Sequence, residues 1–383
     1  MSKTRISCFQ QRPDQITDYL AAVSLHSHTN HSKEGLHFIS HFAAKYPIVH
    51  WAFERQCKKS TIPVDFERAY WTPPLTAEKS YEVESGQIEN ALGLASLVSL
   101  TDHDSIAAPV VLRGLPQQRQ VPFSLEWSVP HLGALFHLGI HNLPEARAAQ
   151  IAAELAAYTK RPCDRLLKEL LTTLDGSPGT LVVFNHPLWD LAHVGPRYGQ
   201  MVVSFLKRYG NFIHALEMNG IRRWPENVRV VELAERFQLP VVSGGDRHGC
   251  QPSGVLNLTR STTFPEFVDE VRIQRRSHVL LMPQYAEPRS VHVINVLLDT
   301  IREYPEHPFG SRRWDDRVYH LFPDTGEYRP ISSLWKAPPG FIQFAFSALR
   351  LLDNKGAQRA LAYIARDTSE QQGPAGADYE VAW

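Results

Sequence analysis

Histidines and carboxylates stand at the ends of apolar runs in this chain. His26 and His28 form an H-x-H pair, and residues Thr101 to Asp104 read T-D-H-D, with His103 between two carboxylates. Side chains two positions apart on a strand point to the same face, so both imidazoles of the pair can reach one cation. Mixed imidazole and carboxylate ligands suit Mn²⁺, Fe²⁺ or Zn²⁺ better than Ca²⁺ or Mg²⁺. The pattern therefore indicates a site for a divalent metal.

Later apolar runs supply more candidates of the same kind. Glu126 follows in SLEW, His137 in ALFHLGIH, His186 in NHP, and both Asp246 and His248 in GGDRH. Each histidine alone is more often an ordinary core or surface residue than a metal ligand. The whole series is more informative, because a parallel β/α barrel brings the carboxyl ends of its strands together around one mouth. The ordered series favours a metal centre built from several strand ends.

The elements that position these residues can be predicted from hydrophobic periodicity. Apolar runs of strand length alternate with amphipathic segments of helix length, which favours parallel β/α units. The predicted strands are 19–26, 95–101, 121–127, 134–141, 181–185, 214–218, 240–244 and 279–282. The predicted helices are 76–92, 143–158, 164–174, 198–208, 225–237 and 264–275. Thr76 is expected to cap the first of these helices, and Gly93 to end it.

Two segments depart from this alternation. Residues 46–75 are rich in proline and aromatic residues and follow the first predicted strand, where the loops of a barrel bind ligands. We expect this segment either to cover the site as a lid or to pack as a small separate core. From residue 290 to 383 the pattern becomes helical, which predicts an accessory extension.

Composition excludes several classes of protein. Among 383 residues, 40 Lys and Arg balance 40 Asp and Glu, and 43% of residues are hydrophobic, as in an ordinary globular protein. Zero net charge disfavours binding to bulk nucleic acid. No apolar run is long enough for a membrane span or a secretory signal, so we expect no membrane partner and a cytoplasmic location. The four cysteines form no C-x-x-C pair, which argues against a thiolate zinc site or a disulfide framework.

The motifs, in their order, resemble those of the polymerase and histidinol phosphatase (PHP) family of metal-dependent phosphoesterases. The family's H-x-H-T-x-x-S, T-D-H-D, G-x-E with a later histidine, N-H-P and G-S-D-x-H correspond to HSHTNHS, TDHD, SLEW with His137, NHP and GGDRH. The resemblance covers about residues 20–285. It implies an α/β fold, a distorted (β/α)7 barrel over 20–289, preceded by a lead-in at 1–19 and followed by the helical extension at 290–383.

The resemblance also implies two or three divalent ions. The ligands expected for the first ion are His26, His28, Glu126 and Asp246. Those expected for the second are Glu126, as a bridge, with His137 and His186. A third ion would use His103, His248 and a residue of the loop after H-x-H. Family members often have Asp in an S-D-G sequence there, whereas this chain has Lys33 at that position, so Glu34 is the first candidate and His31 the second.

The activity implied is hydrolysis of a phosphate ester by a metal-bound hydroxide. The expected substrate is a small phosphomonoester, a nucleotide 3′,5′-bisphosphate or an oligonucleotide end, with Glu126, His186 and Asp246 as catalytic residues. Guanidinium groups bind phosphate oxygens well, so Arg222, Arg223 and Arg247 are candidates for substrate binding. Asp102 and Asp104 are expected to orient the ligands. Two alternatives stay open: a PHP-fold metal-binding regulatory module without catalysis, and a metal-dependent hydrolase of C–N bonds.

Overall fold

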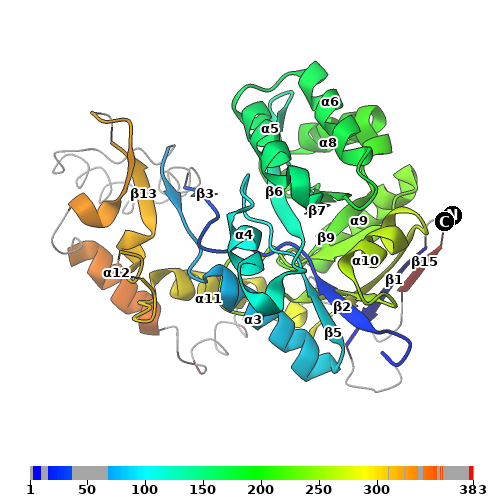
Figure 1. Cartoon of the computed structure of the whole chain (residues 1–383). Helices are drawn as coiled ribbons and strands as arrows, with labels where there is room; N and C mark the ends of the chain where they lie inside the picture. Colours follow the sequence, from blue (N-terminus) through cyan, green and yellow to red (C-terminus); the bar gives the residue numbers. More distant parts are fainter. Residues whose placement is uncertain are drawn as a thin grey trace.

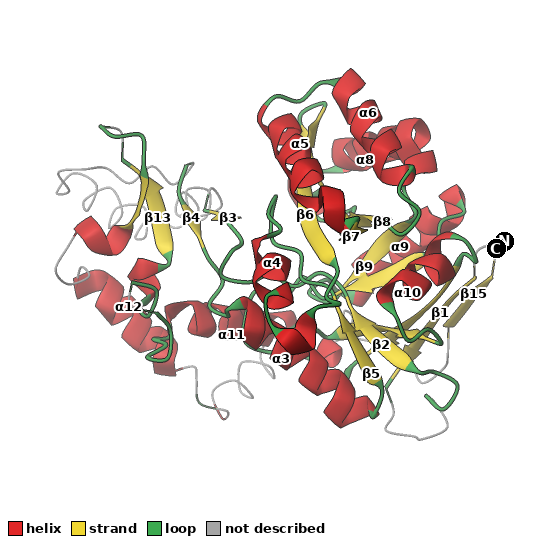
Figure 2. Cartoon of the chain, viewed as in Figure 1, coloured by secondary structure: helices red, strands yellow, loops and turns green. Residues whose placement is uncertain are grey.

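Helices and three β-sheets make up the described part of the chain (Figures 1 and 2). The computed structural model describes residues 3–9, 16–36, 68–308, 310–322, 324–334, 340–351, 354, 356 and 379–382. Most of the predicted insertion, 46–67, lies outside these residues. Within them, no helix combines the length and the apolar character that crossing a membrane requires.

The elements have the following bounds. The strands are β1 (Lys3–Cys8), β2 (Ala21–Ser24), β3 (Glu34–Gly35), β4 (Tyr70–Trp71), β5 (Ala95–Val98), β6 (Phe123–His131), β7 (Ala134–Leu143), β8 (Leu181–Asn185), β9 (Ala215–Asn219), β10 (Val241–Gly244), β11 (Val255–Thr259), β12 (Arg276–Leu281), β13 (Val318–Leu321), β14 (Tyr328–Pro330) and β15 (Tyr379–Ala382). The α-helices are α3 (Ala77–Gln87), α4 (Ala107–Arg113), α5 (Ala148–Lys160), α6 (Asp164–Asp175), α7 (Leu191–Val194), α8 (Pro196–Tyr209), α9 (Trp224–Phe237), α10 (Phe264–Arg272), α11 (Arg289–Ile301) and α12 (Gly340–Arg350).

Local signals set the ends of α3 as predicted. The Thr76 side chain accepts a hydrogen bond from the Lys79 backbone N–H at the start of the helix. A short π-helical turn, Ile88–Leu92, continues α3, and Gly93 ends it with a φ of 66°. Such a left-handed residue costs glycine little, which is why glycine commonly terminates helices.

Two larger sheets carry most of the strands. One has the order β15-β1-β12-β11-β2-β5 and the other β10-β9-β8-β7-β6. Two isolated backbone bridges join the two sheets: Ser27 to Arg247, beyond the ends of β2 and β10, and His103, beyond the end of β5, to Glu126 within β6. Within the described residues these are two bridged sheets, and the closed (β/α)7 barrel stays a prediction. The lead-in at 1–19 contains β1, which pairs in parallel with β12.

The expectation of uniformly parallel β/α units is wrong at two places. Strands β6, β7 and β8 pair antiparallel, because Leu132 and Gly133, with φ values of 50° and 84°, turn β6 directly into β7. A two-residue turn cannot make the long crossover that parallel neighbours need. The second exception is β11, which the sequence analysis missed and which pairs antiparallel with both β2 and β12. Parallel pairing holds for β2 with β5 and for β8, β9 and β10.

The main core lies between the sheet β6–β10 and the helices that cover it. Its large aromatic side chains include Trp127, Phe136, Phe184 and Phe205, which are all buried and pack edge to face or tilted against neighbouring rings. Every residue of β8 and β9 is buried. This packing fixes the carboxyl ends of the strands, where the candidate ligands stand.

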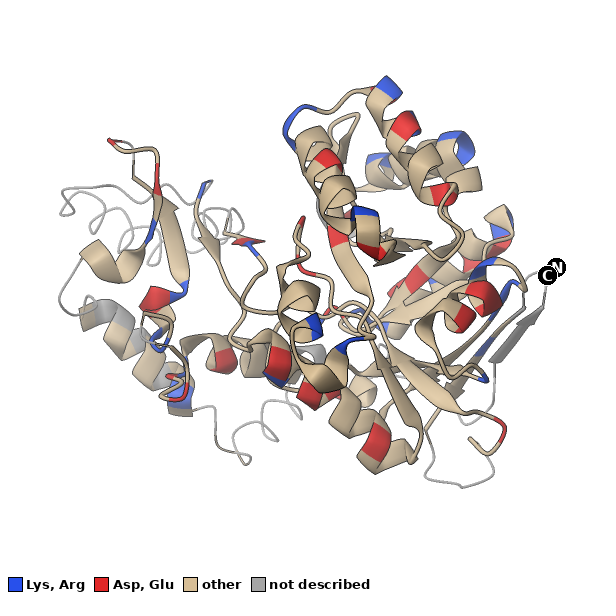
Figure 3. Cartoon of the chain, viewed as in Figure 1, with Lys and Arg blue, Asp and Glu red and all other residues tan. Residues whose placement is uncertain are grey.

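The third sheet, β14-β13-β4-β3, corrects the prediction of a purely helical extension. Its strands β13 and β14 belong to the extension, and β13 pairs with β4 from the region predicted as an insertion. Figure 1 shows this sheet with α12 at one side of the molecule, with α11 leading toward it from the larger sheets. Positively and negatively charged residues are interspersed along the described ribbon (Figure 3).

Candidate metal centre

The nine side chains predicted as metal ligands meet at one place. Their ligand atoms form five overlapping groups of three, and within each group all atoms lie within 4.8 Å of one another. The groups are His26 with His186 and Asp246; His26 with His28 and Glu126; His28 with Asp246 and His248; His28 with Glu34 and His103; and Glu126 with His137 and His186. The fold thus brings together residues from the ends of β2, β5, β8 and β10, from β3 and from within β6 and β7.

Glu126 lies at the centre of these groups. Its Oε1 is 3.2 Å from His26 Nε2 and 3.1 Å from His186 Nε2, and its Oε2 is 3.4 Å from His28 Nε2 and 3.3 Å from His103 Nδ1. Two atoms that each lie about 2.1 Å from one tetrahedral ion are about 3.4 Å apart. The observed spacings match that value. Because the two oxygens face different imidazoles, Glu126 is placed to bridge two cations.

Several polar atoms of the cluster are buried without a hydrogen bond. They are His26 Nε2, His28 Nε2, His103 Nδ1, Glu126 Oε2, His137 Nδ1 and His186 Nδ1. A buried polar group left unpaired costs about 1–3 kcal/mol, so such groups are rare and seldom gathered. A bound cation would satisfy the unpaired imidazole nitrogens and the carboxylate oxygen that face the centre. The residues present therefore fit divalent metal ions.

Glu34 and Asp246 complete the arrangement on one side. Glu34 Oε2 lies 3.1 Å from His248 Nε2 and 3.4 Å from His103 Nε2, and Asp246 Oδ1 lies 3.5 Å from His28 Nε2. The Glu34 carboxylate also accepts a hydrogen bond from the Ser32 hydroxyl. His31, the alternative to Glu34, belongs to none of the groups in the described structure. The geometry selects Glu34 as the candidate.

The carboxylates and imidazoles of the cluster shift one another's pKa values. Burial alone would raise the pKa of Glu34, Glu126 and Asp246, but the surrounding histidines outweigh it and hold each pKa well below its usual value. Burial would lower the pKa of His103 and His248, but the carboxylates outweigh it and raise them to about 10 and about 9. Without metal, protons on these imidazoles balance the carboxylates.

We expect metal binding at the Glu34 group to release protons and to tighten as the pH rises. An imidazole must be neutral to bind a metal, and His103 and His248 without metal are protonated below about pH 10 and about pH 9. For each proton released, the apparent affinity for the metal rises about 10-fold with every unit increase in pH, as long as the pH is below these pKa values. Calorimetric titration with Mn²⁺ between pH 6.5 and 8, in buffers of different ionisation enthalpy, counts the protons. The variant His248→Ala should release about one fewer, and binding without proton release would contradict the expectation.

Three of the candidate ligands have an unusual backbone. His26, His186 and Asp246 have φ values of 62°, 26° and 50°. Left-handed backbone in residues other than glycine costs about 1–3 kcal/mol each and is retained where the surroundings enforce it. All three residues lie within two positions of the end of a buried strand, and the sharp turn directs their side chains toward the cluster. This local strain is typical of functional sites.

Glu217 and Asn219 on β9 orient the ligands, and the sequence analysis missed both roles. Glu217 Oε2 is 2.6 Å from His26 Nδ1, and Glu217 Oε1 accepts the His186 backbone N–H. Asn219 donates from Nδ2 to Glu217 and to Asp246 Oδ2. A carboxylate that holds one ring nitrogen of a histidine leaves the other free for a metal. The available signal was a glutamate and an asparagine inside the buried strand ALEMN.

Asp102 and Asp104 hold backbone rather than imidazoles. Asp102 accepts hydrogen bonds from the backbone N–H and the hydroxyl of Thr29, which fixes the loop after the H-x-H pair, and burial raises its pKa to about 7. Asp104 accepts the backbone N–H of Ser128 on β6. Both therefore position the segments that carry the ligands.

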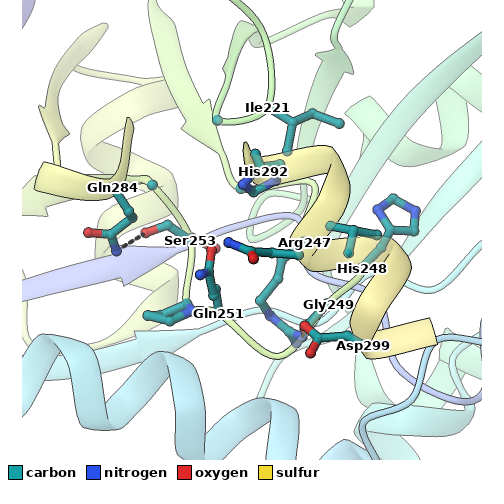
Figure 4. Close-up of a pocket in the computed structure, with 15 residues that line it drawn as sticks. Ile221, Arg247, His248, Gly249, Gln251, Ser253, Gln284, His292 and Asp299 are labelled. Carbon is teal, nitrogen blue, oxygen red and sulfur yellow. Dashed lines mark hydrogen bonds between the residues drawn. The ribbon is translucent and has the colours of Figure 1, made fainter. Parts of the chain in front are cut away.

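Arg247 is engaged within the protein. It is buried, and its guanidinium donates from Nε to Glu84 at 2.7 Å, from Nη1 to the Gly249 carbonyl, and from Nη2 to the His28 carbonyl. Because the side chain is buried and three of its five N–H groups already donate within the protein, Arg247 is poorly placed to bind phosphate, and we do not keep it among the candidate substrate ligands. Figure 4 shows it beside His248 on the loop after β10, in a pocket that α11 closes with His292 and Asp299.

The other two arginines follow β9. Arg222 Nε is buried and makes no hydrogen bond, so this group can still donate to a bound anion. Arg223 directly precedes α9 and already interacts within the protein. Of the three predicted arginines, Arg222 is the remaining candidate for contacting a phosphate.

Comparisons with known proteins do not decide the family. No protein-family model and no curated protein matches this chain. Among solved structures, PsfC from Pseudomonas syringae is similar at 18% identity and a TM-score of 0.38, over 57% of this chain and 87% of PsfC. A Bifidobacterium adolescentis protein described as a candidate metal-dependent phosphoesterase is similar at 15% identity and a TM-score of 0.33, over 53% and 92%. An amidohydrolase from Chromobacterium violaceum is similar at 19% identity and a TM-score of 0.31, over 46% and 83%.

Proposed function

We propose that this chain is a metal-dependent phosphoesterase with a PHP-type distorted barrel. The observation that carries the proposal is the cluster of nine imidazole and carboxylate side chains, several of whose buried polar atoms have no hydrogen bond. Two or three divalent ions, Mn²⁺, Fe²⁺ or Zn²⁺, suit this donor set. Bound there, such ions would activate a water molecule and neutralise the oxygens of a phosphate ester.

The residues of the chain then have distinct tasks. Glu126 and Asp246 carry the negative charge that holds the cations. Glu217 holds Nδ1 of His26, so that Nε2 of this ring faces the cluster. Arg222 offers a donor without a partner to an anionic substrate. The oxyanions recognised in this way belong to a small phosphomonoester, a nucleotide bisphosphate or an oligonucleotide end.

The proposal is tested by removing and restoring the metal. We expect protein stripped with a chelator to hydrolyse no phosphate ester, and the same protein reloaded with Mn²⁺ to release product from at least one of three substrates: a phosphomonoester, a phosphodiester and a nucleotide 3′,5′-bisphosphate. The mock-treated protein, dialysed without chelator, is the control. If protein with stoichiometric metal hydrolysed none of the three, the phosphoesterase proposal would be wrong.

A further inference from the structure

Glu34 reaches the metal centre from a different sheet than the strand-end ligands. It lies on the two-residue strand β3, which pairs with β4 in the register Glu34 to Trp71 and Gly35 to Tyr70. Strand β4 pairs in turn with β13, in the register Trp71 to Val318 and Tyr70 to Tyr319. The carboxylate beside His103 and His248 is thus linked by strand pairing to the C-terminal segment.

The face of this sheet away from the cluster is held by aromatic rings. Tyr70 stacks on Tyr319, with centroids 5.0 Å apart and planes at 13°, and its centroid is 5.2 Å from that of Tyr328. The Lys33 ammonium lies 5.3 Å from the centroid of the Tyr70 ring, a cation–π contact. Neighbouring side chains of an extended segment point to opposite faces, so Lys33 faces the rings while Glu34 faces the histidines. Lys33, at the position where the resemblance predicts an aspartate ligand, is an anchor for β3.

The C-terminal part of the sheet is attached firmly to α11. The Thr72 backbone N–H donates to the Arg317 carbonyl, next to β13. The buried Arg317 guanidinium donates from Nη2 to the carbonyls of Thr300 and Arg302, at the end of α11. Trp71 lies beside the metal centre, with its ring centroid 6.2 Å from that of His248. Contacts therefore run without a break from α11 through β13 and β4 to Glu34.

We propose that the sheet β14-β13-β4-β3 positions Glu34, so that metal occupancy at the group of Glu34, His103 and His248 depends on the order of the C-terminal strands. The inference shares with the proposed function the assumption that the cluster binds metal, but it does not require hydrolysis. Strands of two to four residues form a sheet of low intrinsic stability. Coupling between two sites is reciprocal, so metal bound by Glu34 must also stabilise β13 and β14.

The first test disturbs the sheet and measures the metal. Tyr319→Ala removes the ring that stacks on Tyr70, whereas Tyr319→Phe keeps the ring and removes only the hydroxyl. Equilibrium dialysis with Mn²⁺, followed by elemental analysis, gives the number of ions per chain and their affinities. We expect Tyr319→Ala to weaken one class of Mn²⁺ site about 10-fold or more, and Tyr319→Phe to bind Mn²⁺ as the wild type does. Identical Mn²⁺ binding by Tyr319→Ala and the wild type would overturn the inference.

The second test changes the metal and measures the sheet, so it needs no substitution in β13 or β14. Amide hydrogen exchange is followed in peptides from β13 and β14, with and without Mn²⁺. We expect Mn²⁺ to slow exchange about 10-fold or more in the wild type and not in Glu34→Gln, which keeps the shape of the side chain but loses its charge. Equal protection in both proteins would overturn the inference. Wild-type protein that bound no Mn²⁺ would overturn both this inference and the proposed function, whereas bound metal without hydrolysis would overturn the proposed function alone.

Discussion

Replacement of Glu126 by glutamine is expected to reduce metal-dependent hydrolysis by at least about 10²–10³-fold, the usual effect of removing a central electrostatic group. Both carboxylate oxygens lie within 3.4 Å of an imidazole nitrogen, and Oε2 makes no hydrogen bond. Glutamine has the same shape, but its amide carries no charge and its NH₂ group cannot bind a cation. The measurement is kcat/KM with saturating Mn²⁺, together with the number of bound ions.

The matched control is Glu145→Gln. Glu145 is an exposed carboxylate that pairs with Arg113 and belongs to none of the candidate metal-binding groups of the described residues. This variant should keep wild-type activity. Asp246→Asn and His186→Ala should lose activity as Glu126→Gln does, while circular dichroism shows the fold retained. If Glu126→Gln stayed within a few-fold of the wild type, the cluster would not be the catalytic centre.

Replacement of Glu84 by alanine is expected to lower the free energy of unfolding by about 3–5 kcal/mol, because it leaves a buried charge unpaired. Glu84 is fully buried on α3, and its carboxylate accepts hydrogen bonds from Arg247 Nε and from the hydroxyls of Ser24 and Ser27. These partners lie in β2, in the H-x-H segment and in the loop after β10. Urea-induced unfolding of metal-free protein measures the loss without any contribution from the metal.

A double-mutant cycle separates the interaction energy of Glu84 with Arg247 from the energies of their other contacts. Glu84→Leu with Arg247→Met should destabilise the protein by less than the sum of the two single changes, because the double variant leaves no unpaired charge. For comparison, Lys79→Ala at the exposed pair with Glu82 should change the free energy of unfolding much less. Additive effects of Glu84→Leu and Arg247→Met would mean that the ion pair does not stabilise the fold.

Eight of the nine side chains of the cluster could be named from the residues themselves, for two reasons, whereas Glu34 was a candidate only through the resemblance. Their types are those that bind transition metals, and their positions at the ends of apolar runs limit where a layered α/β fold can place them. Strands β8 and β10 and helix α3 with its cap at Thr76 were also predictable, because periodicity and capping are local signals. Such predictions can be made from residues that are close to one another in the sequence.

Tertiary structure decided what depends on distant partners. Glu34 rather than His31 joins the cluster because β3 pairs with β4, a pairing that neither residue's neighbours reveal. Arg247 resembles a phosphate ligand until its partner Glu84, 163 positions away in the chain, is placed beside it. The same holds for the extension, whose strand β13 pairs with β4. The sequence by itself determined which groups could bind metal, whereas long-range pairing and burial determined which of them point inward and what each one contacts.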